Sequence, residues 1–302
     1  AEILTSAGNG LLAVRVYDAM IDRYADFPLV VGRAREARST ALTSSADPAT
    51  ERSQLESLAL AEDPTLALEG ELGLARLAVR MEDRQGAIER YEGVLESFED
   101  SPEITLPATR ELAALYIASG DVDQAANLLE QAVESAGDAA FKVDLRETLA
   151  EVWLAAGEYA RARAPLEKTL VEFADSVFYV TRTKLHLAGI HDQAGEVAQA
   201  KALYRAVAAA NLDPETTGAA LFGEATLVRR VGRPEEALPL MDQALVVLPA
   251  KNPLRGVVAV ERAELLADLG RGSVGEVESM LAEARDVGFD KDQPGAFAEL
   301  LL

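Results

Sequence analysis

The stretch LAEVWLAAGEYARARAPLEKTL, residues 149–170, decides the fold of this chain. It places Leu149 and Ala150 in one helical pattern, Gly157 at a turn, and Ala162 early in a second helical pattern. The same arrangement returns along the chain with a nearly constant period. The second-pattern alanine recurs at steps of 38, 37, 38 and 37 residues, as Ala87, Ala125, Ala162, Ala200 and Ala237. The first-pattern alanine stands twelve residues earlier each time, as Ala75, Ala113, Ala150, Ala188 and Ala225.

A fixed period made of two helical patterns and a turn predicts a stack of helical hairpins, because neighbouring repeats then bury one another's apolar faces. Glycine ends the first pattern in four repeats, at Gly120, Gly157, Gly195 and Gly232, with Glu82 in the first. A leucine precedes the first alanine at Leu74, Leu112, Leu149 and Leu187, and the register breaks only at Glu224. We therefore expect an all-α solenoid.

The paired alanines mark where the two helices of a hairpin approach most closely, since only a small side chain fits when helix axes come within about 8–9 Å. Large side chains at helical spacing surround them. Four residues after the second alanine stand Tyr91, Leu129, Leu166, Tyr204 and Met241. The ten alanine positions are expected to be buried.

This pattern resembles the tetratricopeptide repeat family, although the units are 37 to 38 residues long instead of the usual 34. The resemblance implies a right-handed superhelix formed by one solenoid domain over 1–302. We expect an N-terminal half-repeat or cap over 1–27, with a lone helix near 9–26, and a C-terminal cap over 288–302. About seven hairpins are expected over 28–287, at 28–62, 64–99, 102–136, 138–174, 176–211, 213–249 and 252–287.

Composition excludes several classes of partner. The formal charge of -22 opposes nucleic acids and anionic lipid surfaces, because affinity for both depends on neutralising their negative charge. No stretch approaches the roughly 20 apolar residues of a membrane helix, so no direct membrane insertion is expected. The absence of cysteine excludes disulfides and thiolate chemistry. Richness in alanine and arginine favours a bacterial source.

Several second helices end alike, in RYADFP (23–28), SFEDSP (97–102) and EFADSV (172–177). These endings are similar to the repeats of bacterial envelope proteins such as the periplasmic partner of the Tol-Pal system, which usually show Tyr-Pro where this chain has Ala or Glu. The sequence leaves two alternatives for the compartment, the bacterial cytoplasm and the periplasm. A targeting or anchor segment before Ala1 is also left open.

No catalytic, cofactor-binding or metal-binding residues are predicted. The two histidines, His186 and His191, lie five residues apart on one predicted helix. Metal ligands on a helix need spacings of three or four to share a face. His191 also occupies the position of Tyr116 and Trp153 in other repeats, which indicates a packed side chain. We expect no enzyme.

The resemblance implies that the first helix of each hairpin lines a concave groove. Counting from the alanines places these candidate peptide-binding residues on that face: Arg76, Arg80, Arg110, Ile117, Leu154, Arg182, Leu185, Phe222, Arg229 and Arg230. The six arginines predict a positive strip able to fork onto partner carboxylates. The alternative is that they pair with neighbouring glutamates in solvent.

The resulting hypothesis is a noncatalytic scaffold that holds a peptide or a helix of a protein partner. Three alternatives stay open: a self-assembling structural or regulatory module, a homo-oligomer, and an envelope-associated assembly protein. The sequence does not identify the partner.

Overall fold

The structure, a computed structural model, describes residues 16–17, 19–20, 23, 48–98, 102–271 and 275. Within these ranges every regular element is an α-helix. The helices are α4 (Pro48–Ala59), α5 (Pro64–Arg80), α6 (Arg84–Ser97), α7 (Pro102–Ser119), α8 (Val122–Ser135), α9 (Ala139–Ala155), α10 (Tyr159–Glu172), α11 (Val177–Gln193), α12 (Val197–Ala210), α13 (Pro214–Arg230), α14 (Pro234–Val247) and α15 (Pro253–Asp268).

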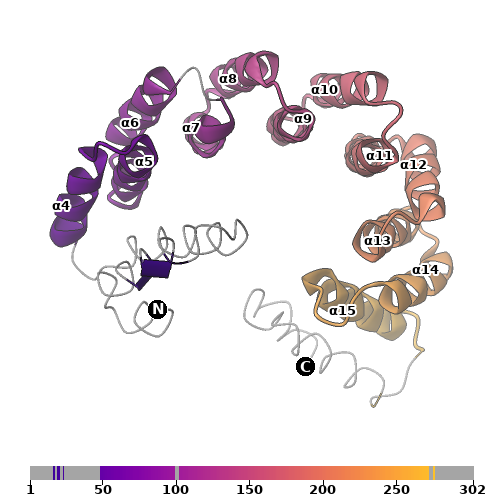
Figure 1. Cartoon of the computed structure of the whole chain (residues 1–302). Coiled ribbons are helices and arrows are strands. Elements are labelled where there is room, and N and C mark those ends of the chain that lie inside the picture. The colour runs from indigo at the N-terminus through magenta and orange to yellow at the C-terminus, as the bar shows by residue number, and fades with distance from the viewer. Residues whose placement is uncertain are drawn as a thin grey trace. The chain divides into compact units, whose positions relative to one another are not determined.

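The chain divides into two compact units, Ala1–Phe141 and Lys142–Leu302. The first contains α4 to α8 and the second contains most of α9 together with α10 to α15. Consecutive helices pack against each other from α4 to α8 in the first unit and from α10 to α15 in the second. Within each unit the odd-numbered helices lie on one side and the even-numbered helices on the other (Figure 1). We call the side of the odd-numbered helices the first-helix face.

The predicted hairpins are confirmed where the structure describes them. The ranges 64–99, 102–136, 138–174, 176–211 and 213–249 contain the pairs α5–α6, α7–α8, α9–α10, α11–α12 and α13–α14. The hairpin at 28–62 is described only in α4, and the hairpin at 252–287 mainly in α15. The C-terminal cap at 288–302 and most of the N-terminal segment lie outside the described residues. The all-helical solenoid class is thus confirmed, whereas the single-domain assignment over 1–302 stays a prediction.

The ten alanine positions are buried, as their spacing predicts. Exposed fractions are 0–2% for Ala75, Ala113, Ala150, Ala188 and Ala225, and 0% for Ala87, Ala125, Ala162, Ala200 and Ala237. The large residues of the same pattern cover them, with Tyr91, Leu129, Leu166 and Met241 almost fully buried. Small residues therefore mark the contact between the helices of each hairpin.

The turn between the two helices needs a left-handed residue. Gly157 has a φ of 76°, and Glu82, at the same position in the first repeat, has a φ of 62°. A residue with a Cβ pays roughly 1 kcal/mol in this conformation. The next helix still begins normally, because Asp83 caps α6 by accepting a hydrogen bond from the Gly86 backbone N–H at 3.0 Å.

The break in the leucine register at Glu224 has a structural reason. The Glu224 side chain is buried in α13, where the other repeats have leucine. Arg205 of α12 donates from Nε to its Oε1 at 2.7 Å, and Lys201 Nζ lies 3.8 Å from the same oxygen. A buried carboxylate is tolerated when it is paired and hydrogen-bonded. An ion pair therefore joins α12 to α13 where apolar contact joins the equivalent helices elsewhere.

Replacing Ala150 by phenylalanine should lower the free energy of unfolding by about 1–3 kcal/mol or more, because the buried contact has no room for a ring. Urea unfolding measures this change. Ala209→Phe, at an exposed position of α12, is the matched control and should have a much smaller effect. Equal stability of Ala150→Phe and the parent would show that the assigned register is wrong.

Candidate interaction surface

The arginines predicted to form a positive strip are mostly paired with carboxylates of other helices. In the first unit, Arg76 of α5 forks onto Glu111 of α7. Its Nε lies 3.0 Å from both carboxylate oxygens, and its Nη2 lies 2.6 Å from Oε1. The buried hydroxyl of Tyr91 also donates to Glu111. The hydrogen bond to Glu111 raises the pKa of Arg76, and burial raises the pKa of Tyr91.

Arg80 pairs with the buried carboxylate of Glu51 in α4, with Nη2 2.5 Å from Oε1. Arg110 of α7 is exposed. In the second unit, Arg230 of α13 pairs with Asp192 of α11 and donates to its backbone carbonyl at 3.1 Å. The ion pairs of Arg80 and Arg230 connect neighbouring helices, and the partner carboxylates neutralise the two guanidinium charges.

Arg229 shows the same behaviour towards the next repeat. Its Nη2 lies 3.2 Å from Glu261 and its Nη1 lies 3.7 Å from Glu264, both on α15. Burial raises the pKa of Glu261, which Arg229 opposes. Two carboxylates therefore face one guanidinium here.

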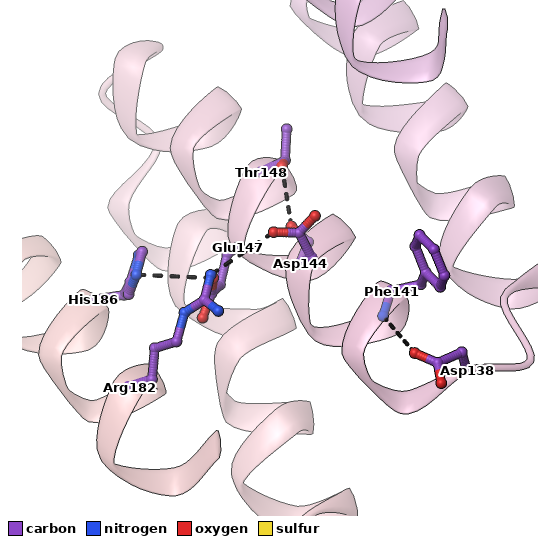
Figure 2. Close-up of polar contacts among 7 residues, drawn as sticks. All are labelled: Asp138, Phe141, Asp144, Glu147, Thr148, Arg182 and His186. Atoms are coloured by element: carbon purple, nitrogen blue, oxygen red, sulfur yellow. Dashed lines mark hydrogen bonds and ion pairs between the residues drawn. The ribbon is translucent and has the colours of Figure 1, made fainter. Parts of the chain in front are cut away.

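Glu147 of α9 is a second buried carboxylate of this set (Figure 2). Arg182 of α11 donates from Nη2 to Glu147 Oε2 at 2.5 Å and lies 3.7 Å from Asp144 Oδ1. His186 Nε2 is 3.9 Å from the same Glu147 oxygen. Burial raises the pKa of Glu147 to about 7, opposed by Arg182 and assisted by Asp144 and Glu151. Burial also lowers the pKa of His186.

Ion pairs between helices thus engage Arg76, Arg80, Arg182, Arg229 and Arg230. The pairing agrees with the alternative interpretation of these residues, in which neighbouring carboxylates neutralise them. A role of the six arginines in peptide binding stays a prediction. The spacing of the partners offers a signal in the sequence, because Glu111 and Glu147 each lie 35 residues, close to one period, from their arginines.

The predicted apolar contacts occupy intermediate positions. Ile117, Leu154, Leu185 and Phe222 are all partly buried. Leu185 and Phe222 pack against the cores around Ala188 and Ala225, respectively. Each therefore offers only part of its side chain to a partner.

A groove opens on the first-helix face between α5 and α7. It has a volume of about 460 Å³ and is lined by Arg76, Val79, Arg80, Tyr91, Glu111, Ala114 and Leu115. Val79 is 42% exposed, and Ala114 is also exposed. The sequence predicted Arg76 and Arg80 here. It did not predict Glu111 or Leu115, because their places depend on how two repeats stack.

The described residues show no sign of a metal site or a membrane span. Among them, no group of three or more His, Cys, Asp or Glu side chains could hold a metal ion. In the same part of the chain, no helix is both long and apolar enough to cross a membrane. His191 instead contacts Glu196, with Nδ1 2.5 Å from Oε2.

The chain matches models of a known protein family. Sequence models described as "Tetratricopeptide repeat" match residues 78–142 and 116–180, and one described as "Tetratrico peptide repeat" matches residues 181–289. Together they cover more than half of the chain. The matched region begins in the last turn of α5 and contains the helices from α6 to α15.

One bacterial protein is similar in sequence to this chain. "Cellulose synthase operon protein C" of Xanthomonas axonopodis pv. citri (strain 306) is 28% identical over 204 residues, which cover 64% of this chain and 13% of that protein. The chain therefore spans a small part of that relative's length.

Solved structures are similar in fold. A tetratricopeptide repeat protein from Parabacteroides merdae ATCC 43184 has a TM-score of 0.56 and 16% identity, covering 95% of this chain and 98% of that one. Yeast Tom70 has a TM-score of 0.63 and 14% identity, covering 97% of this chain and 58% of that one. At these identities the likeness shows the fold alone.

Substituting Glu147 by glutamine should remove a pH dependence of stability. Because the folded pKa of Glu147, about 7, lies above its ordinary value of 4.5, the folded state binds the extra proton and is stabilised by it below pH 4.5. This stabilisation is lost as pH rises through about 7. Relative to Glu147→Gln, the parent should lose about 2–3 kcal/mol between about pH 5 and pH 8.

Chemical denaturation of both proteins at the two pH values measures this difference. Glu167→Gln removes an exposed carboxylate from α10 and is the matched control. If the parent and Glu147→Gln keep a constant difference in stability across this range, the raised pKa of Glu147 is refuted.

Proposed function

The chain belongs to the tetratricopeptide repeat family, and from this premise we propose that it binds a segment of a partner protein on its first-helix face. Proteins of this family are in general non-catalytic interaction scaffolds. The groove between α5 and α7 is the observation that carries the proposal, because it lies on the first-helix face, which membership of this family implies for recognition. The similarity to a Xanthomonas protein supports a bacterial source.

The chemistry of the groove favours an amphipathic helix over an acidic tail as its occupant. Arg76 and Arg80 line it, but each already has a carboxylate partner, Glu111 or Glu51. Their charges therefore attract a partner carboxylate weakly. Val79, Ala114 and Leu115 offer apolar surface instead. Burying one leucine or phenylalanine side chain there would contribute about 1.5–3 kcal/mol to binding.

The partner segment is thus expected to insert an apolar side chain between two first helices. Helices bind grooves in this way through apolar residues spaced three and four apart. Binding of this kind is expected to resist salt, because apolar contact is not screened by ions, whereas attraction between exposed charges is.

Filling the groove tests the proposal. Ala114→Phe places a ring in the groove and should reduce partner capture from an extract of the source cell at least tenfold, roughly 1.4 kcal/mol. Ala160→Phe, at an exposed position of α10 in the other unit, is the control and should capture as the parent does. Quantitative mass spectrometry of the captured proteins, at low and high salt, measures both.

Capture that is unchanged by Ala114→Phe would contradict the groove as the binding site. Capture that is lost at high salt in the parent would instead favour recognition through charged groups. Circular dichroism of both variants checks that each has kept its helical content.

A further inference from the structure

A second site on the first-helix face lies in the other unit, around Glu147. We call it the Glu147 site and define it by Asp144, Glu147 and Glu151 of α9 together with Arg182 and His186 of α11. The side chains of Asp144, Glu147, Arg182 and His186 converge between the two helices (Figure 2). It shares no residue with the groove between α5 and α7.

Glu147 has a carboxylate oxygen without a partner. Its side chain is 5% exposed, and Oε2 accepts a hydrogen bond from Arg182 at 2.5 Å. Oε1 is buried and has no hydrogen-bond partner among the described residues. Buried polar atoms in folded proteins are nearly always paired, so an unpaired carboxylate oxygen indicates a missing donor.

The electrostatic environment of the Glu147 site calls for a cation. The guanidinium of Arg182 forms ion pairs with both Glu147 and Asp144. His186 contributes little positive charge at neutral pH, because burial lowers its pKa. Burial is the main cause of the raised pKa of Glu147, and the charges of Asp144 and Glu151 add to it against the opposing effect of Arg182. The site thus holds three carboxyl groups for the one guanidinium of Arg182.

We propose that the Glu147 site binds a basic side chain, lysine or arginine, of a partner protein. The ligand cation donates to Oε1 of Glu147, and Glu151 adds attraction from the exposed surface of α9. The ligand can reach the carboxylate by displacing Arg182, because the Arg182 side chain is 39% exposed and has Asp144 as a second partner. A metal ion is a poorer candidate, because the described residues contain no suitable cluster of ligands.

This assignment reverses the charge expected of the partner at α9 and α11. The sequence predicted that Arg182 would receive an acidic group, whereas the structure shows Arg182 engaged and Glu147 short of a donor. The overall charge of -22 acts in the same direction, because it attracts basic segments to the chain.

A pair of synthetic peptides tests the Glu147 site directly. Both have the same short alanine and leucine sequence, with arginine at the centre of one and the neutral isostere citrulline at the centre of the other. Titration calorimetry should show binding of the arginine peptide at least tenfold tighter than that of the citrulline peptide. Equal binding of the two peptides would overturn the proposal.

Proton release distinguishes this site from general attraction to an acidic protein. A cation at Glu147 favours the ionised carboxylate, so binding near pH 7 should release up to about half a proton. Calorimetry in two buffers of different ionisation enthalpy measures this release. Binding of the arginine peptide without proton release would place the peptide elsewhere on the acidic surface and overturn the assignment.

Three variants complete the test. Glu147→Gln should weaken binding of the arginine peptide at least tenfold and abolish proton release, whereas Glu167→Gln, which removes the same charge from the exposed side of α10, should stay within twofold of the parent. Arg182→Ala removes the resident guanidinium and should bind the peptide at least as tightly as the parent. A tenfold loss in Arg182→Ala, or full binding by Glu147→Gln, would overturn the proposal.

Discussion

The close approach of two helices at a pair of alanines is the constraint on which the rest of this structure depends. Ala150 and Ala162 are buried in the third described hairpin, and the corresponding pairs recur in the others. A small side chain at both positions leaves room for larger residues of the same hairpin, and Leu166 and Trp153 are both buried there. The repeat period follows from this contact, because each hairpin presents the same surface to the next.

Ion pairs add a second level of connection between hairpins. Arg76 reaches Glu111 and Arg182 reaches Glu147, each across nearly one period. Such pairs neutralise arginines whose positions in the sequence made them candidates for binding acidic ligands. The proposed recognition therefore depends on the apolar part of the groove between α5 and α7 and on the unpaired oxygen of Glu147.

Much of the fold could be predicted from periodicity, because a repeated pattern reports the same contact many times. The burial of Ala150 and the turn at Gly157 follow in this way. The site could be predicted only in part. Counting along a helix assigned Arg182 to the groove face, but its pairing with Glu147 depends on the path of its long side chain towards the preceding repeat. Glu224 likewise appeared as a break in the pattern, and only the approach of Arg205 explains it.

If stability arises from contacts within hairpins and between neighbours, it should survive the loss of one end. The most direct measurement is circular dichroism, with thermal unfolding, of a fragment from which 252–302 have been removed. The fragment should keep its helical signal and unfold at a lower temperature, because α14 has lost the apolar cover that α15 gives. Complete loss of the helical signal would contradict the solenoid and favour a single closed core.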